Sequence, residues 1–324
     1  MPLLPSTYRA PLWMPGGHAQ TILAAKMVPR PQVDYRRERW DTPDADFVDV
    51  DFALPEPASD AAPVLVLFHG LEGSSQSHYA LSVMRAAADR SWRGLVAHFR
   101  GCSGEPNRLP RAYHSGDSEE GDWILRRVQA RWPHARLFAV GISLGGNMLA
   151  KWLGERAEDA RFVTAAASIG SPLDLAAGGA AISRGFSLVY TKMFLATLRD
   201  KALAKIERFP GVADAAAVRA SRNLYEFDNA FTAPLHGFRD TEDYWSRASA
   251  KPLLPGVRVP HLLLNARNDP FVPAASLPRS AQVSREVYLE QPEEGGHIGF
   301  AQGAPPGNLD FLPQRLFRFF EHGA

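Results

Sequence analysis

The sequence predicts an α/β fold, in which helices cover both faces of a mostly parallel β-sheet. Two observations predict it. Short, unbroken apolar runs, typical of strands buried on both faces, alternate along the chain with segments of helical periodicity. At one such transition a serine stands between two glycines, in Gly141-Ile142-Ser143-Leu144-Gly145. The 324 residues are ample for one large core, and we expect residues 1–324 to form a single domain.

The predicted strands begin with an alternating segment at residues 46–52, which indicates a half-exposed antiparallel strand at one edge of the sheet. A proline-rich loop at residues 55–63 separates this segment from the first buried run. The predicted buried strands are, in chain order, Val64–Phe68, 94–99, 136–140, Val163–Ile169, 261–265 and 285–289.

Helical periodicity fills most of the intervals between these runs. The helix predicted at residues 144–158 shows why, because its apolar residues at 144, 148, 149, 152 and 153 fall on one helical face. The predicted helices are 79–90, Ser118–Arg131, 144–158, 274–280 and 309–320.

Residues 173–259 break this alternation. They contain no convincing buried strand and instead show helical patches at 186–204, 213–224 and 241–249, rich in Phe, Tyr, Leu and Met. Since the strand pattern returns at His261, we interpret residues 173–259 as a helical cap inserted into the sheet domain. A second, independent domain is the alternative.

Composition excludes several classes of protein. Lys and Arg number 36 against 35 Asp and Glu, so the net charge of +1 gives no field suited to nucleic acid. A single cysteine, Cys102, excludes an intramolecular disulfide framework. No apolar run approaches the roughly 20 residues that cross a bilayer, and no signal-peptide pattern is present. We expect a cytoplasmic protein without transmembrane segment or nucleic-acid partner, whose oligomeric state composition leaves open.

Ser143 is the candidate nucleophile. Its motif follows a buried apolar run and opens a helical pattern at Leu144, which is the strand–turn–helix setting of a nucleophile elbow. The serine occupies a strained position on a sharp turn, where side chains on either side would clash, so glycines flank it. The turn also places the hydroxyl at a helix N-terminus, whose partial positive charge favours a developing anion. A merely structural turn is the other interpretation.

A serine hydroxyl needs a positioned base before it can attack. Among ten histidines, His297 follows the last predicted strand in a glycine-rich loop. A doubly wound sheet presents residues to its ligand crevice at that place. We therefore choose His297 as the base, with His114 as the main competitor.

The base in turn needs a carboxylate that orients the imidazole and stabilises its charged form. Asp269 follows the predicted strand 261–265 and is our candidate; Asp174, after the preceding strand, is the alternative. The order Ser143, Asp269, His297 along the chain is the order that an α/β-hydrolase requires.

An oxyanion hole requires two backbone N–H groups aimed at the carbonyl oxygen as it becomes charged. One is expected from Leu144, the residue after the nucleophile. The other is expected from Leu71, in the loop His69-Gly70-Leu71-Glu72-Gly73 that follows the first buried strand.

The segment of residues 100–117 carries polar side chains whose role spacing alone leaves open. They bind an anionic substrate group or tie this long loop to the sheet; the residues are Arg100, Asn107, Arg108 and Arg111. Cys102 is a conceivable second nucleophile, yet no base is identifiable beside it, so we treat it as a small packed residue. The acidic residues at 117–120 fit a first helical turn, and we expect neither a metal nor a cofactor.

Four segments resemble the YheT-like hydrolases, which are α/β-hydrolases related to a eukaryotic group of membrane-anchored lipases. They are Gly17-His18-Ala19-Gln20-Thr21, residues 68–74 (FHGLEGS), 99–108 (FRGCSGEPNR) and 113–117 (YHSGD), and the resemblance runs from about residue 10 to 320. It implies a carboxylic-ester hydrolase for short- or medium-chain acyl esters, including acylglycerols or phospholipids. The family's catalytic Ser, Asp and His fall on Ser143, Asp269 and His297. This chain departs from the eukaryotic group in showing no N-terminal membrane anchor.

The residues together predict a serine esterase that acts on a small-molecule ester, lipids included, through an acyl-enzyme. Two alternatives stay open. One is an acyltransferase, in which an alcohol or thiol takes the acyl group in place of water. The other is a non-catalytic binding protein on a hydrolase fold.

Overall fold

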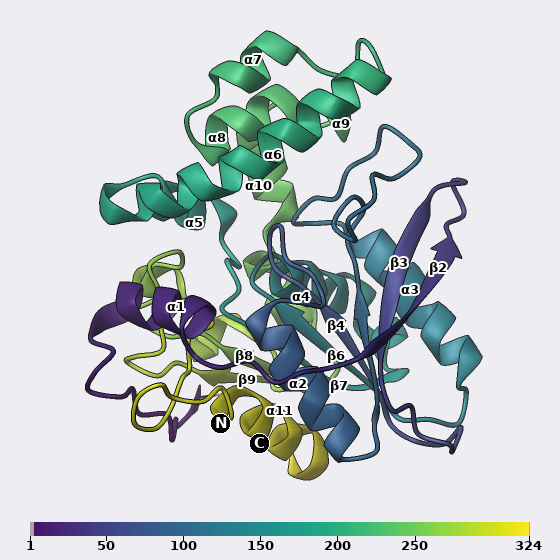
Figure 1. Cartoon of the computed structure of the whole chain (residues 1–324), viewed down its shortest axis with the longest axis vertical. Coiled ribbons are helices and arrows are strands. Elements are labelled where there is room, and N and C mark those ends of the chain that lie inside the picture. The colour runs from purple at the N-terminus through teal and green to yellow at the C-terminus, as the bar shows by residue number, and fades with distance from the viewer. Residues whose placement is uncertain (1–2, 324) are drawn as a thin grey trace.

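A nine-stranded sheet organises the part of the chain that the computed structural model describes, residues 3–323 (Figure 1). The strand order is β1-β9-β8-β7-β6-β4-β5-β3-β2. The strands are β1 (Leu3–Leu4), β2 (Tyr35–Asp41), β3 (Phe47–Ala53), β4 (Val64–Phe68), β5 (Arg93–Ala97), β6 (Leu137–Ile142), β7 (Val163–Ile169), β8 (His261–Leu264) and β9 (Val287–Glu290). Pairing is parallel except where β3 meets β2 and β5. The predicted α/β fold is therefore confirmed, and pairing is antiparallel at one edge. The half-exposed edge strand predicted at residues 46–52 is wrong: all seven residues of β3 are buried, because β2 pairs outside it and forms the edge.

The helices lie in two layers on the sheet and in one group apart from it. They are α1 (Gly16–Lys26), α2 (His78–Asp89), α3 (Ser118–Arg131), α4 (Leu144–Arg156), α5 (Leu175–Ile182), α6 (Leu188–Arg208), α7 (Ala215–Ala220), α8 (Leu224–Phe227), α9 (Ala233–Leu235), α10 (Thr241–Ala248) and α11 (Phe311–His322). Short 3₁₀ turns and one π-helical turn, Asp228–Thr232, complete the chain.

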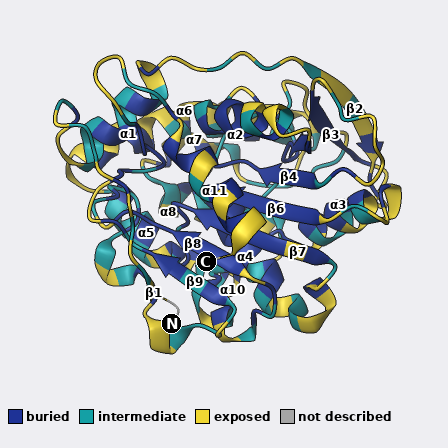
Figure 2. Ribbon diagram, turned by 90° about the horizontal axis from the view of Figure 1, so that it is seen from below, coloured by how far each residue is buried: buried dark blue, intermediate teal, exposed yellow. Residues whose placement is uncertain are grey.

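Two hydrophobic cores occupy the two faces of the sheet, and β4 shows how one strand feeds both. Its side chains alternate, so Val64 and Val66 join the core under α3 and α4, whereas Leu65 and Leu67 join the core under α2 and α11. All five residues of β4 are buried, as Figure 2 shows for the central strands. Each such side chain contributes roughly 1.5–3 kcal/mol relative to exposure.

The helices α5–α10 stand apart from these layers. The chain leaves the sheet at the end of β7 and returns at β8, its neighbour in the sheet, and the described residues between them form no strand. Figure 1 shows these helices gathered above the sheet, on the side toward which the loop of residues 99–117 projects. We call residues 173–259 the helical segment.

Several predicted elements differ from the structure. The helix predicted at 274–280 is wrong: only a 3₁₀ turn, Ala274–Ser276, forms. Pro278 explains this, because the residue before a proline avoids the helical region, and Leu277 is extended with φ −61° and ψ 144°. Sequence patterns also missed α1 and β2. The first begins with two glycines, and the second is a highly charged edge strand without an apolar run.

Candidate active site

Ser143 lies on the sharp turn between β6 and α4, with φ +51° and ψ −114°. A non-glycine residue in this region is strained, and such strain persists only where the surroundings impose it. The flanking glycines explain how the turn closes. A Cβ on Gly141 would lie 2.4 Å from the Gly145 carbonyl oxygen, and one on Gly145 would lie 2.5 Å from the Phe68 carbonyl oxygen. Larger residues would therefore force β6, α4 and β4 apart.

The residues chosen as nucleophile, base and acid lie in one hydrogen-bonded line. Ser143 Oγ is 2.9 Å from His297 Nε2, and His297 Nδ1 is 2.8 Å from Asp269 Oδ2. The Asp269 side chain is fully buried, and its other oxygen accepts hydrogen bonds from the backbone N–H groups of Phe271 and Val272. The Phe271 ring lies 4.1 Å from the imidazole, centroid to centroid. The imidazole is thus held in one orientation.

Helix α1, which the sequence patterns missed, supports this arrangement from the N-terminal end of the chain. The His297 backbone N–H donates to Thr21 Oγ1 at 2.8 Å. Gln20 Oε1 accepts from the Gly295 N–H and from the Asn268 side chain, at 2.8 and 2.9 Å. One helix therefore fixes both the loop that carries His297 and the loop that carries Asp269. The only sequence signal was the segment of residues 17–21 in the family resemblance.

The loop with Leu71 passes close to the nucleophile, because a Cβ on Gly70 would lie 3.2 Å from Ser143 Cβ. Both neighbours of Leu71 have their backbone N–H groups occupied. Gly70 donates to the Tyr79 hydroxyl and Glu72 to the Tyr113 hydroxyl, each at 3.0 Å. Among residues 3–323, the Leu71 N–H has no such acceptor.

The second expected donor, Leu144, is the first residue of α4. The first N–H groups of an α-helix have no partner within the helix. Leu144 directly follows Ser143, so its N–H begins the helix beside the candidate nucleophile.

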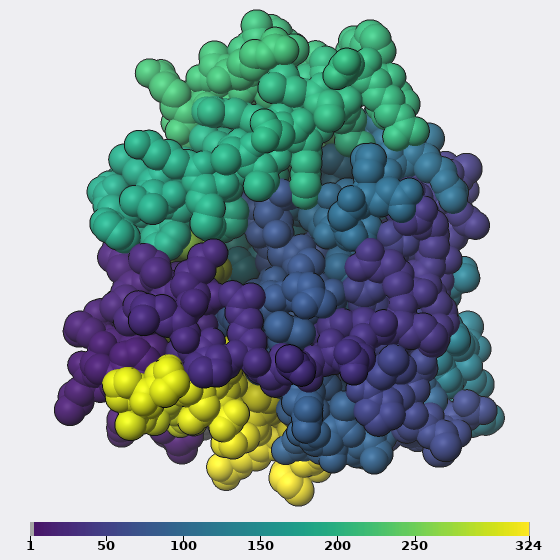
Figure 3. Space-filling view, in the orientation of Figure 1, coloured from purple at the N-terminus to yellow at the C-terminus, as the bar shows by residue number. Residues whose placement is uncertain are grey.

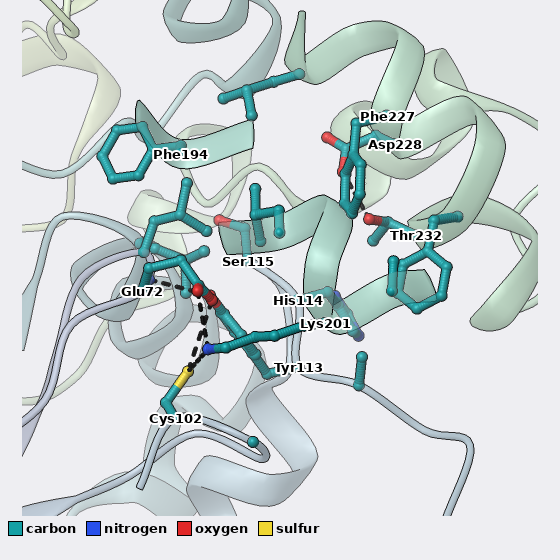
Figure 4. Close-up of a pocket in the computed structure, with 18 of the residues that line it drawn as sticks. Glu72, Cys102, Tyr113, His114, Ser115, Phe194, Lys201, Phe227, Asp228 and Thr232 are labelled. Atoms are coloured by element: carbon teal, nitrogen blue, oxygen red, sulfur yellow. Dashed lines mark hydrogen bonds and ion pairs between the residues drawn. The ribbon is translucent and has the colours of Figure 1, made fainter. Parts of the chain in front are cut away.

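A cavity of about 560 Å³ opens beside Ser143 and His297 and runs between the helical segment and the loop of residues 99–117. Figure 3 shows the surface hollowed along the seam between the helical segment and the rest of the chain. Most of its exposed lining is aliphatic and aromatic, and Figure 4 shows Phe194 and Phe227 among the lining residues. The cavity is also lined by Leu71, Leu144, Leu198 and Phe231. Its size and character suit a small, largely apolar ligand.

The polar side chains of residues 100–117 mostly hold their own loop. The Arg100 guanidinium forms ion pairs with the carboxylates of Asp44, Asp46 and Glu120, with N–O distances of 2.5–3.2 Å. Burial raises the pKa of Glu120 to about 7. The other three make comparable contacts: Asn107 bonds Asp46, Arg108 bonds Asp41 and Arg111 bonds Asp117. Of the two interpretations, these contacts favour the structural tie.

The competing candidates occupy other positions. Asp174 caps α5 and accepts the Ala177 N–H at 3.1 Å. His114 packs against the His236 ring at a tilt and against the Tyr244 ring edge to face, and burial lowers its pKa to about 3. Burial raises the pKa of Cys102 to about 12, so its thiol stays protonated at neutral pH and is a poor nucleophile.

Two further properties concern cofactors and membranes. Within residues 3–323, no three or more His, Cys, Asp or Glu side chains come together as a metal-binding group. In the same range, no helix combines the length and the apolar character that crossing a bilayer demands.

Comparison with known proteins places these features in a family. A family model described as the alpha/beta hydrolase fold matches residues 63–304. The chain is 40% identical to the "Putative esterase YheT" of Escherichia coli over 88% of this chain and 84% of that protein. It is 28% identical to human phospholipase ABHD3, over 99% of this chain and 81% of that protein. It is also 28% identical to a Saccharomyces cerevisiae monoacylglycerol lipase, over 75% of this chain and 56% of that protein.

Solved structures agree on the fold. An esterase of Pyrococcus furiosus, Pf2001, superimposes with a TM-score of 0.55 over 92% of this chain and 98% of that one, at 17% sequence identity.

Proposed function

The chain belongs to the YheT-like hydrolases of the α/β-hydrolase superfamily and is esterase- or lipase-like, and we propose that it is a serine carboxylic-ester hydrolase. The observation that carries the proposal is the continuous hydrogen-bonded line from Asp269 through His297 to Ser143, at one end of an apolar cavity. A positioned base beside a serine hydroxyl is what nucleophilic catalysis needs.

In the proposed reaction, His297 Nε2 takes the Ser143 proton while Oγ attacks the ester carbonyl carbon. The carbonyl oxygen becomes an oxyanion that the Leu71 and Leu144 N–H groups bind. His297 then donates its proton to the departing alcohol oxygen, which leaves the acyl group on Ser143. Water, deprotonated by the same imidazole, attacks the acyl-enzyme and releases the carboxylic acid. Asp269 holds the imidazole and stabilises its charged form throughout.

The cavity supports an ester with an aliphatic acyl chain, with acylglycerols and phospholipids among the candidate substrates. Most of its exposed lining is aromatic and aliphatic, so a hydrocarbon chain gains free energy by leaving water for it. Phe194, Leu198 and Phe227 come from the helical segment. We accordingly infer that residues 173–259 are a cap inserted into a single domain spanning residues 1–324, and that the cap selects the substrate.

An activity-based probe tests the nucleophile. A fluorophosphonate should label the wild-type protein and fail to label Ser143→Ala. Ser246→Ala is the matched control, because Ser246 is exposed on α10, outside the cavity lining. Equal labelling of Ser143→Ala and the wild type would refute the nucleophile.

A panel of p-nitrophenyl and glycerol esters of increasing acyl length tests the substrate class. We expect kcat/KM to rise with acyl length until the chain fills the cavity. Adding an alcohol or thiol acceptor to the same assay separates hydrolysis from acyl transfer, since a transferase would yield the new ester or thioester. Binding of these esters without any turnover would contradict the enzyme itself.

A further inference from the structure

Glu72 joins three separate parts of the molecule beside the proposed oxyanion hole. Its own loop follows β4, Tyr113 belongs to the loop of residues 99–117, and Lys201 comes from α6 in the helical segment (Figure 4). Tyr113 donates its hydroxyl proton to Glu72 Oε1 at 2.8 Å, and Lys201 Nζ lies 2.8 Å from Glu72 Oε2. The Glu72 side chain is only 9% exposed, against 45% for Lys201.

The backbone of Glu72 is strained at this junction. Its φ is +54°, in the left-handed region that a residue with a Cβ rarely adopts. Such a conformation persists where surrounding contacts impose it. Here both the backbone N–H and the side chain of Glu72 are held, the first by the Tyr113 hydroxyl and the second by Tyr113 and Lys201.

This strain bears directly on Leu71, the preceding residue. The Leu71 N–H lies in the peptide plane between Gly70 and Leu71. The φ and ψ angles of Leu71 connect this plane to Glu72. On the other side, the Gly70 N–H is fixed by Tyr79. The Gly70 carbonyl, in the same peptide plane as the Leu71 N–H, accepts from the Gly73 N–H at 2.9 Å and lies 2.8 Å from His69 Nδ1. The direction of the Leu71 N–H therefore depends on these contacts and on the anchor at Glu72, and only the anchor at Glu72 includes a residue of the helical segment.

Lys201 is the only cation in an ion pair with Glu72 among the described residues. The other groups against the carboxylate are the Tyr113 hydroxyl and the Cys102 thiol, whose sulfur lies 3.9 Å from Oε1. Neither carries a compensating charge. Without Lys201, the nearly buried carboxylate would keep the hydrogen bond from Tyr113 but would have no opposite charge beside it, which favours its rotation toward water. That rotation would release the Glu72 backbone.

We propose that Lys201 and Glu72 are positioning residues that hold the Leu71 N–H toward the oxyanion, so that docking of α6 onto the body assembles the oxyanion hole. The inference rests on the proposed function. It makes the helical segment part of the catalytic geometry as well as a wall of the cavity. Neither side chain takes part in bond making or proton transfer.

The test compares Lys201→Met, which removes the charge and keeps much of the length, with Lys201→Arg, which keeps the charge. Glu72→Gln removes the other charge while leaving an oxygen for Tyr113. Lys192→Met is the control, because Lys192 is exposed on the same helix and lies outside the cavity lining. For each variant, kcat and KM are measured with one p-nitrophenyl ester, together with the Ki of a matching trifluoromethyl ketone.

We expect Lys201→Met and Glu72→Gln each to lower kcat about tenfold, short of the 10²–10³ that follows complete loss of a donor. The Ki of the ketone, whose adduct places an oxyanion in the hole, should weaken by a similar factor, with KM changed less than threefold. The double variant should be no slower than the slower single variant, because both break the same link. Lys201→Arg should keep kcat within about threefold of the wild type.

Three results would overturn the inference. The first is a change in KM alone, which would make Lys201 a substrate contact. The second is an unchanged Ki for the ketone in Lys201→Met and Glu72→Gln, and the third is additive losses in the double variant. Retained labelling of Ser143 in the wild type shows in each case that the proposed function survives. Circular dichroism melting identifies any variant that has unfolded. If Lys201→Met has unfolded, the kcat and Ki of Glu72→Gln decide whether the inference stands.

Discussion

The residues of the candidate active site on the sheet side, which we call the floor (Ser143, Asp269, His297 and the loop of residues 69–73), differ in construction from the helical segment above them. The floor sits on buried strand ends, and backbone or side-chain hydrogen bonds fix His297, Asp269 and Gly70. The helical segment has its own small cores. It exposes large apolar side chains just before and along the start of α6, where Phe186 is 55% and Met193 50% exposed. Under the proposed function, the residues on the sheet fix the chemistry, while a separately packed layer selects the substrate.

Individual polar contacts link the two regions. Lys201 pairs with Glu72, and His18 on α1 lies 3.1 Å from the Tyr190 hydroxyl on α6. Lys205 donates to Asn107 Oδ1 and to the carbonyl oxygens of residues 109 and 111. Changes in the floor should therefore remove catalysis, and changes in the helical segment should act on specificity, pH response or geometry.

The largest effect is expected at the acid of the floor. Asp269→Asn should lower kcat by roughly 10³–10⁴, because an amide no longer stabilises the charged imidazole or selects its tautomer. Steady-state kinetics with a p-nitrophenyl ester measures this. Asp174→Asn is the matched control, since Asn caps a helix as well as Asp does and should leave kcat within about twofold. Comparable losses in both variants would return Asp174 to candidacy.

A second prediction concerns a carboxylate inside the helical segment. Asp228 lines the cavity and accepts hydrogen bonds from the Thr232 hydroxyl and Trp245 Nε1, at 2.6 and 2.8 Å. Burial raises the pKa of Asp228 to about 6. A raised carboxyl pKa means that the folded state holds its proton longer than the unfolded state does. The contribution of Asp228 to the free energy of unfolding is therefore fully present below pH 4 and is lost as the pH rises to about 6.

Asp228→Asn removes that titration. Between pH 4 and 6 the unfolding free energy of the wild type should fall relative to the variant, by at most about 3 kcal/mol. Urea unfolding at several pH values measures the difference, with Asp200→Asn on the exposed side of α6 as control. A difference that stays constant across this range would contradict the assignment.

A smaller effect is expected where α1 supports the floor. Thr21→Val keeps the shape of the side chain and removes the oxygen that accepts the His297 N–H. The lost hydrogen bond should cost about 1–2 kcal/mol of stability and, by loosening the histidine loop, about tenfold in kcat. Thr197→Val, an exposed threonine of α6, is the control. Unchanged kcat with reduced stability would limit Thr21 to a structural role.

Sequence patterns predicted elements of both regions. The helical patches at 186–204 and 241–249 correspond to α6 and α10. The strands Val64–Phe68 and Val163–Ile169 and the helix Ser118–Arg131 have the predicted bounds, because each carries an unbroken apolar run or a clear helical face. Ser143, Asp269 and His297 were chosen from one motif and from positions after predicted strands. Such positions are local in sequence, which is why a single sequence is enough to predict them.

The supporting residues left no comparable signal. Thr21 and Gln20 act across more than 270 residues, and Lys201 lies 129 residues from Glu72. Residue type alone does not distinguish Tyr113, or a lysine on a half-exposed helix, from an ordinary surface residue. Their partners are fixed only when the sheet brings distant loops together. The same limit explains why sequence alone leaves residues 100–117 open.

The contacts of α1 also bear on the order in which the protein becomes active. Residues near position 20 hold loops near positions 268–297, and β1 pairs with β9 at the far edge of the sheet. During synthesis on the ribosome, the first helix must wait for almost the whole chain before its partners exist. Such long-range contacts form late and slowly. The nascent chain would thus carry its serine turn well before the histidine loop is in place, so the proposed hydrolytic activity would emerge only after residues near 297 have been synthesised.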